Sequence, residues 1–285
     1  MKLFQAYLLL LLFFSLTVTP PAIAKYAKIG CSDRCGNVMI PFPFGIGAKC
    51  SINQWYIVDC KNSRPYLPAL NNLEVLRVNL VSQTVTVSTP RITDCQNPVR
   101  KSSEIMGVDL GGSPFWFSKP HNKFVLEGCG MALMVMENGS VATGCSTACL
   151  NVTTGNRNNC FGNGCCQMAI PQHLKSYSIN ITGLEEGEGA CGSAFLVEDE
   201  TSYVQADSPY PFLFTNTSFT PVSLLWTLTD SDQLTCCNHE SPQWRFVDMF
   251  DGTRIDTWKC DPSVYFYDEQ SWNPYLTDGC KDDGM

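Results

Sequence analysis

The sequence predicts a mostly-β, disulfide-rich and loop-rich protein, made of small β-sheet or sandwich-like modules with few short helices. Sixteen cysteines follow an N-terminal segment with the features of a signal peptide, and an even number of cysteines in an exported chain indicates a disulfide framework. Apolar residues alternate in short runs, which 21 glycines and 17 prolines interrupt. Strand side chains alternate between two faces, so this pattern is typical of strands joined by turns.

The N-terminal segment predicts export. Lys2 precedes an apolar run over residues 3–18, and a small-x-small motif follows at residues 22–24. These features predict a signal peptide over residues 1–24, with a mature chain that starts at Lys25. A membrane anchor is the alternative interpretation, which the short run and the cleavage motif disfavour. No later segment approaches the roughly 18 consecutive apolar residues of a spanning helix, so we expect a secreted, extracellular protein.

The stretch "CGNVMIPFPFGIGAKC", residues 35–50, predicts an edge strand or extended segment. Five apolar residues occupy alternate positions: Val38, Ile40, Phe42, Phe44 and Ile46. An extended chain turns all five toward one face, which predicts that they belong to the core. Pro41 and Pro43 lack N–H groups and face the same edge, which cannot pair further.

Further strands are expected along the chain. Residues 73–92 contain two alternating runs with a polar break at residues 82–84. Residues 122–137 continue the alternation, as do residues 176–183. Residues 171–177 suit a short helical turn, whereas 221–229 fit either a strand or a helix.

The cysteines are expected to form up to eight disulfides. They stand at positions Cys31, Cys35, Cys50, Cys60, Cys95, Cys129, Cys145, Cys149, Cys160, Cys165, Cys166, Cys191, Cys236, Cys237, Cys260 and Cys280. The pairs in "CSDRC" (31–35) and "CSTAC" (145–149) leave zinc as an alternative. The chain has only three histidines and thiols oxidise during export, so we favour disulfides and expect no metal site.

Two pairs of cysteines are adjacent in sequence, at 165–166 and 236–237. A bridge between neighbours is strained, so each pair is expected to reach two different partners and join three chain segments. The pairing itself cannot be deduced from spacing.

Four Asn-x-Ser/Thr sequons fall in the second half of the chain. They are Asn138, Asn151, Asn180 and Asn216. In an exported chain such motifs are acceptors for N-glycans, which predicts a glycosylated surface over this half.

The net charge of −8 is unevenly distributed. Residues 25–101 contain ten basic and four acidic side chains, whereas residues 102–285 contain eight basic and 23 acidic ones. This separation suggests that the basic part contacts a polyanion. Two solvated faces that partly attract one another are the alternative interpretation.

Enzymatic motifs are not evident. "GEGACG" (187–192) satisfies the pattern GxGxxG, but it follows two glutamates and contains a cysteine, so we interpret it as a loop. Acidic pairs such as those at 199–200 and 282–283 are interpreted as solvated carboxylates, although composition does not exclude a carboxylate-dyad hydrolase. We expect no enzyme, no cofactor and no nucleic-acid partner.

Several cysteine-anchored motifs occur in a characteristic order. They are "CSDRCGNVMIPFPFGIGAKC" (31–50), "FVLEGCGMALMV" (124–135), "TGCSTAC" (143–149), "CFGNGCCQMAIP" (160–171), "CGSAFLVED" (191–199) and "PVSLLWTL" (221–228). Together they resemble the extracellular part of plant wall-associated receptor kinases, and the first resembles the family's galacturonan-binding module. The resemblance covers nearly the whole mature chain.

The tail departs from the family pattern. "SWNPYLTDGCKDDGM" (271–285) is similar to the end of an EGF-like module, but four cysteines stand in residues 230–285 where six are expected. The resemblance implies a galacturonan-binding-like module over 25–136, a kinase-associated extracellular module over 137–229 and a degenerate EGF-like tail over 230–285. Family members are single-pass membrane proteins. The sequence contains no membrane-spanning segment after residue 24 and no kinase motif. The resemblance therefore does not imply catalysis by this chain.

The resemblance implies non-enzymatic binding of pectin, the polygalacturonate of the cell wall. The candidate ligand-binding residues are Arg34, Lys49, Lys61 and Arg64, with Trp55 and Tyr56 as sugar-facing aromatics. Lysine and arginine pair with uronate carboxylates, arginine in bidentate fashion. Calcium that bridges pectin to the acidic half is a variant of this hypothesis.

Two alternatives remain open. In the first, the chain is an extracellular protein-interaction module or a decoy for a receptor, and its acidic and aromatic segment 261–272 contacts a peptide or a receptor ectodomain. In the second, it is a truncated receptor gene product.

Overall fold

The computed structural model confirms the predicted mostly-β, disulfide-rich fold. It describes residues 26–94, 103–106, 108–128, 130–148, 160, 162, 164–182, 192–199, 218–237, 242–248, 254–260 and 273–277. In these parts the helical segments are short 3-10 turns, among them η1 (Gln54–Tyr56), η2 (Pro68–Leu70) and η4 (Asp230–Asp232). Across the described parts of the chain, no helix has the length and apolar character needed to cross a membrane.

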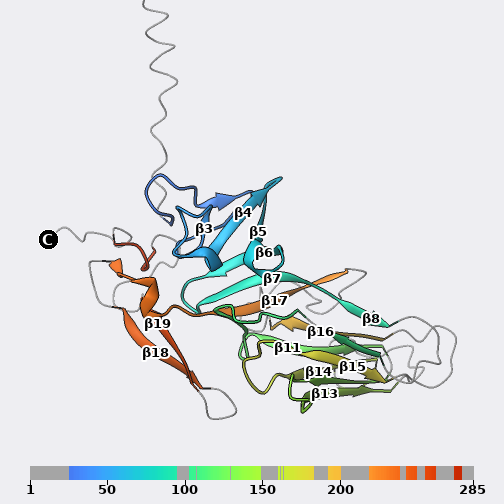
Figure 1. Cartoon of the computed structure of the whole chain (residues 1–285). Helices are drawn as coiled ribbons and strands as arrows, with labels where there is room; N and C mark the ends of the chain where they lie inside the picture. Colours follow the sequence, from blue (N-terminus) through green and yellow to red (C-terminus); the bar gives the residue numbers. More distant parts are fainter. Residues whose placement is uncertain are drawn as a thin grey trace, which may run out of the picture.

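A seven-stranded sheet forms the centre of the protein, in the order β10-β17-β7-β6-β5-β4-β3 (Figure 1). Its strands are β3 (Gly45–Ile46), β4 (Ile57–Lys61), β5 (Arg64–Leu67), β6 (Leu73–Asn79), β7 (Thr84–Pro90), β10 (Phe115–Phe117) and β17 (Phe219–Trp226). Neighbouring strands are antiparallel except β3 and β4, which are parallel. The two runs predicted in residues 73–92 are confirmed as β6 and β7, and residues 221–226 are strand.

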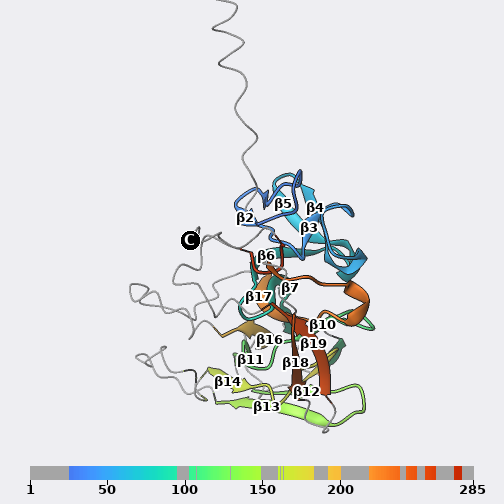
Figure 2. The same ribbon diagram turned by 90° about the vertical axis from the view of Figure 1, so that its left-hand side faces the viewer.

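Two four-stranded sheets form a sandwich-like unit beside the central sheet (Figure 1 and Figure 2). One has the order β14 (Cys165–Ala169), β11 (Asn122–Glu127), β16 (Gly192–Glu198) and β8 (Ile92–Asp94). The other has the order β13 (Val141–Thr147), β12 (Gly130–Val135), β15 (Ser178–Thr182) and β9 (Ser103–Met106). Every second residue of these strands faces inward, because side chains alternate along a strand. Phe124 of β11, Met134 of β12 and Ile179 of β15 thereby belong to one shared core.

Two ribbons complete the fold. β1 (Arg34–Cys35) pairs with β2 (Val38–Met39). β18 (Gln243–Asp248) pairs with β19 (Arg254–Lys259), and Figure 1 shows this orange ribbon standing apart from the green sheets. The backbone N–H of Trp258 donates to the carbonyl of Leu228 at 2.9 Å, so β19 is held against the segment that leaves β17.

Strand pairing crosses the module limits expected from the sequence. β17, from the expected second module, joins β7 and β10 in the central sheet. β11 and β12, from the expected first module, pair with β14, β16, β13 and β15. The limits themselves stay predictions, but the sheets depend on segments from both sides of residue 136.

Residues 35–50 contribute core side chains, as predicted. Ile40, Phe42 and Phe44 are buried. The segment is not one continuous extended strand, however, because a turn separates β2 from β3. Pro41 and Pro43 explain the interruption, since neither can donate to a strand ladder.

An aromatic cluster lies where the central sheet meets the tail. The rings of Phe44 and Trp226 are 5.9 Å apart, and those of Trp226 and Tyr275 are 5.4 Å apart, all in edge-on arrangements. Tyr56 and Phe115 complete the cluster. All five side chains are fully buried, and such pairs contribute about 0.5–1.5 kcal/mol beyond the burial of their area.

Five disulfides confirm the predicted framework. They are Cys31–Cys50, Cys35–Cys60, Cys145–Cys166, Cys160–Cys165 and Cys236–Cys260. Cys237 is also disulfide-bonded. The cysteines at 95, 129, 149, 191 and 280 lie outside the described residues.

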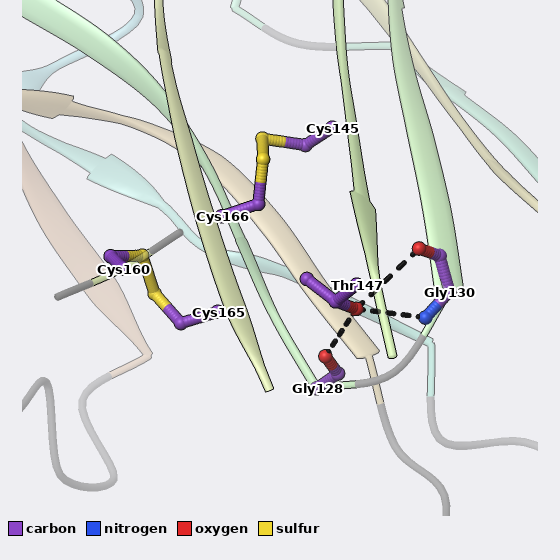
Figure 3. The surroundings of a disulfide bond; sticks show 7 residues. All are labelled: Gly128, Gly130, Cys145, Thr147, Cys160, Cys165 and Cys166. Atoms are coloured by element: carbon purple, nitrogen blue, oxygen red, sulfur yellow. Dashed lines mark hydrogen bonds between the residues drawn. A yellow bond between two sulfur atoms is a disulfide. The ribbon is translucent and has the colours of Figure 1, made fainter. Parts of the chain in front are cut away.

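Adjacent cysteines reach different partners, as expected. Figure 3 shows Cys165 bonded to Cys160 and Cys166 bonded to Cys145, so one strand end joins two other segments. Beside them the Thr147 hydroxyl donates to the Gly128 carbonyl at 2.6 Å and accepts from the Gly130 N–H at 3.0 Å.

Two of the four sequons fall within the described residues. Asn138 is exposed in the turn between β12 and β13, where its side-chain oxygen accepts from the Ser140 N–H at 3.0 Å. Asn180 is half-buried in β15. Asn151 and Asn216 lie outside the described residues, as do the signal segment 1–24 and the aromatic segment 261–272. Glycan occupancy stays a prediction.

Asn273 connects the tail to the N-terminal part. Its side chain is fully buried, and Nδ2 donates to the carbonyls of Tyr26 and Phe42, both at 2.7 Å. Its Oδ1 accepts from the Tyr275 N–H at 2.9 Å. The amide therefore satisfies a donor and two acceptors that burial has removed from water.

We predict that Asn273→Asp lowers the free energy of unfolding by about 3 kcal/mol or more, because a carboxylate would face two buried carbonyls that need donors. Asn273→Ala should cost less, about 2 kcal/mol. Urea denaturation with the disulfides intact measures both, with the exposed Asn37→Asp as control. Equal stability of Asn273→Asp and Asn37→Asp would contradict this role.

His173 lies where the central sheet contacts the segment that leads into the two four-stranded sheets. Residues Phe117 and Leu174 form a β-bridge, and His173 Nδ1 accepts from the Lys119 N–H at 3.3 Å. Burial lowers the pKa of His173 to about 4, with further lowering by Lys119 and His121. The folded protein therefore favours the neutral imidazole.

We predict an acid-sensitive contribution from this histidine. Because the folded pKa lies below the unfolded value of about 6.5, the contribution is complete above that pH and is lost as pH falls toward 4. At lower pH the loss approaches about 3 kcal/mol, at 1.36 kcal/mol per pKa unit. Stability measured from pH 7 to 3.5 should fall less steeply in His173→Gln than in the wild type. Parallel curves would contradict the assignment.

Candidate functional site

Three of the four predicted cationic residues gather near the end of β4. Arg34 lies in β1 next to Cys35, and Lys61 ends β4 next to Cys60. The disulfide holds the Cα atoms of Cys35 and Cys60 5.7 Å apart, so Arg34 and Lys61 occupy adjoining segments. Arg64 lies opposite Lys61 in the β4–β5 register. All three are exposed, and we call Arg34, Lys61 and Arg64 the basic patch.

A close approach of two turns fixes the geometry of the basic patch. Asn62 and Ser63 form the β4–β5 turn with φ of 51° and 60°, the left-handed conformation of tight hairpins. Gly36, in the β1–β2 turn, has φ of +59°, and a Cβ there would lie 2.1 Å from the Ser63 carbonyl oxygen. Glycine therefore lets the two turns pack and sets Arg34 beside the hairpin.

Two carboxylates accompany the patch. Lys61 Nζ lies 3.1 Å from Asp59, and Arg64 Nε lies 3.7 Å from Glu74. The cationic side chains are 60% and 66% exposed, and ion pairs of this kind contribute only about 0–1 kcal/mol. Within the described residues Arg34 has no ion pair. A ligand carboxylate could therefore replace the existing partners at little cost.

Lys49 lies on the exposed turn that follows β3. The Gly47 N–H donates to the Val58 carbonyl at 3.2 Å, which sets this turn beside β4. The Cys31–Cys50 disulfide, with Cα atoms 5.8 Å apart, ties the turn to the N-terminal loop. Its joint action with the basic patch stays a prediction.

Tyr56 is a core residue, and its predicted sugar-facing role is wrong. The side chain is fully buried, its ring lies 5.0 Å from that of Phe44, and its hydroxyl donates to the Thr227 carbonyl at 2.6 Å. Burial raises the pKa of Tyr56 well above its usual value, and Asp232 raises it further, so the hydroxyl remains a donor. A buried tyrosine and a ligand-facing one look alike in the sequence.

Trp55 is half-buried and lies far from the basic patch. It belongs to η1, at the start of β4, whereas Lys61 is the last residue of β4. The intervening strand separates them by on the order of 15 Å, at about 3.3 Å per residue. Trp55 and the basic patch therefore lie at two separate places and do not form the single cluster that the sequence predicted.

Trp55 lines a groove of about 730 Å³ together with Trp116. Its walls come from η1, the loop before β10, η4 and β19. The Asn53 amide donates to Asp232 Oδ1 at 2.7 Å, and the Thr229 N–H donates to Asp232 Oδ2 at 2.7 Å. The first bond joins η1 to η4, and the second caps η4 itself. We call this site the tryptophan groove.

Lys175 supplies a cation to the tryptophan groove. Its Nζ lies 3.9 Å from the centre of the Trp116 ring and donates to the carbonyls of Ser113 and Phe115. Burial lowers the pKa of Lys175 to about 8, against the opposing effect of Asp109. The side chain is half-buried.

Two family models match the chain. Residues 31–89 match the model described as wall-associated receptor kinase galacturonan-binding, and residues 157–235 match the model described as wall-associated kinase. The chain is a relative of the wall-associated receptor kinases. The first match contains the whole basic patch together with Lys49 and Trp55.

Individual wall-associated receptor kinases of Arabidopsis thaliana align with most of the chain. Wall-associated receptor kinase 5 is 30% identical over 295 residues, which cover 96% of this chain and 37% of that protein. Wall-associated receptor kinase-like 1 is 28% identical over 284 residues, which cover 90% of this chain and 38% of that protein. The chain thus spans less than two fifths of the length of these relatives. No solved structure matches it.

The sequence did not reveal most of the tryptophan groove. Trp116, Lys175, Asp232 and Asp256 lie in four segments that are brought together only in the fold. One signal was present for Trp116: it stands between Phe115 and Phe117, and alternation along a strand turns it away from the core that these two residues enter.

Proposed function

We propose that this chain is a non-enzymatic, extracellular polysaccharide-binding region whose basic patch pairs with the carboxylates of polygalacturonate. The observation that carries the proposal is that three exposed cations, Arg34, Lys61 and Arg64, lie on adjoining segments held together by the Cys35–Cys60 disulfide and the β4–β5 register. All three lie inside the region that matches a galacturonan-binding family model. Binding at this surface requires only ion pairing and hydrogen bonding.

The chemistry of the patch suits a chain of carboxylates. Arginine presents a planar fork that can hold one carboxylate through two N–H donors, whereas lysine offers a point charge. Arg34 and Arg64 flank Lys61 through the Cys35–Cys60 disulfide and the hairpin register. Several carboxylates on one ligand could therefore be engaged together, with an affinity that salt weakens.

The disulfides support an extracellular location. Five bridges lie in the described part of the chain, and such a density is typical of exported proteins. The matching relatives are named as wall-associated receptor kinases, so we propose a cell-wall setting for this chain also. Calcium bridging between uronate and the acidic half belongs to the same proposal as a variant.

We predict that the fourfold variant Arg34→Glu, Lys49→Glu, Lys61→Glu and Arg64→Glu binds oligogalacturonide at least about tenfold more weakly than wild type, since each substitution replaces attraction by repulsion. Calorimetry over a salt series, with and without calcium, measures the effect. The wild type should weaken as salt rises, and the variant should show little salt dependence.

A matched control reverses two cations outside this surface, Arg245→Glu with Arg254→Glu in the β18–β19 ribbon. It should bind oligogalacturonide as the wild type does. Unchanged binding by the fourfold variant, with its thermal stability intact, would overturn the assignment of the basic patch.

A further inference from the structure

A second hollow adjoins the tryptophan groove. This hollow, of about 530 Å³, shares Thr229 and Asp256 with the groove and adds Trp244 and Trp258 to its lining. Four of the six tryptophans in the chain therefore line these two adjoining hollows. Exposed indole faces are costly in water, and their concentration at one place indicates a surface for a ligand with apolar faces.

The lining also carries polar groups of both signs. Asp232 and Asp256 line the groove and Asp230 lines the second hollow, whereas Lys175 is the cation of the lining. The carboxylates disfavour a polyanion. The Lys175 ammonium over the Trp116 ring disfavours a second cation on that ring, because like charges repel in a partly buried site.

Ionised carboxylates only accept hydrogen bonds, so a partner for them must bring donors. The hydroxyls of Thr229 and Ser231 line the same wall and can donate or accept. An uncharged ligand with several hydroxyls satisfies these groups without bringing a charge of either sign. Flat apolar faces on that ligand would cover the indoles.

The walls are held in place without a ligand. The Trp258 indole N–H donates to Asp230 at 2.5 Å, and the Leu228 N–H donates to the Thr257 hydroxyl at 3.0 Å. Together with the bond between Asn53 and Asp232, these contacts join β19, η4 and η1. A preformed site loses little conformational entropy when it binds.

We propose that the tryptophan groove binds an uncharged pyranose chain. Pyranose rings combine C–H faces that stack on indole with hydroxyls that reach the carboxylates and hydroxyls of the lining. The site is separate from the basic patch, which lies at the other end of β4, and it favours an uncharged ligand, whereas the basic patch favours an anionic one. It therefore does not rest on the binding of polygalacturonate.

Filling the groove tests this proposal without removing a packed side chain. Gly112 lines the groove, is exposed, and has nothing within 4 Å of the position its Cβ would take. Gly112→Trp should occupy the groove, whereas Gly112→Ala should leave it open. The probes are cellohexaose and fully methyl-esterified oligogalacturonide, two sources of uncharged pyranose, in calorimetry and tryptophan fluorescence on the full mature chain.

We expect wild type and Gly112→Ala to bind at least one probe, and Gly112→Trp to bind it at least about tenfold more weakly with unchanged thermal stability. The probe that binds identifies the source. No binding of either probe by the wild type, or equal binding by Gly112→Trp, would overturn the proposal. The fourfold variant of the basic patch should retain this binding, which separates the two sites.

A second pair of variants tests the indole itself. Trp55→Ala should weaken probe binding. Phe219→Ala is the control and should not weaken it, because Phe219 lies outside the groove and its side chain is 56% exposed. Asp256→Asn keeps the size of an exposed lining residue and should weaken binding by only a few fold, since one acceptor remains. Equal losses in Trp55→Ala and Phe219→Ala would contradict a role for the indole.

Discussion

The insertion of β17 between β7 and β10 is the contact on which most of this structure depends. It carries Trp226 into the cluster of Phe44, Tyr56 and Phe115, where every ring is fully buried. The residues after β17 contact η1, where the Tyr56 hydroxyl donates to the Thr227 carbonyl. Because β17 comes more than 120 residues after β7, only this later part of the chain joins β10 to the rest of the central sheet.

The basic end of the sheet is stabilised differently. β1, β2 and β3 contain two residues each, which is too little strand to hold a loop by pairing alone. Two disulfides supplement this short pairing: Cys31–Cys50 ties the N-terminal loop to the turn after β3, and Cys35–Cys60 joins β1 to β4. Cross-links of this kind restrict the unfolded chain, so small exported modules can keep charged loops in a defined arrangement.

The two proposed sites use opposite ends of one strand. The basic patch surrounds the last residue of β4, and the tryptophan groove begins at η1 just before its first residue. One end presents exposed cations with weak carboxylate partners, whereas the other presents indoles with carboxylates and a half-buried lysine. A polysaccharide with both acidic and uncharged stretches offers chemistry for each end.

The sequence by itself determined the strand class, the disulfide framework and the chemistry of the exposed cations. Alternation is local, so β6 and β7 could be predicted from residues 73–92, and the adjacent cysteines at 165–166 required separate partners. The tertiary structure alone decided that Tyr56 is core and Trp55 is not, because neighbouring aromatics differ only in what folds over them. It also assembled the tryptophan groove from η1, β10, η4 and β19. Such contacts depend on chain segments far apart in sequence, and no local pattern encodes them.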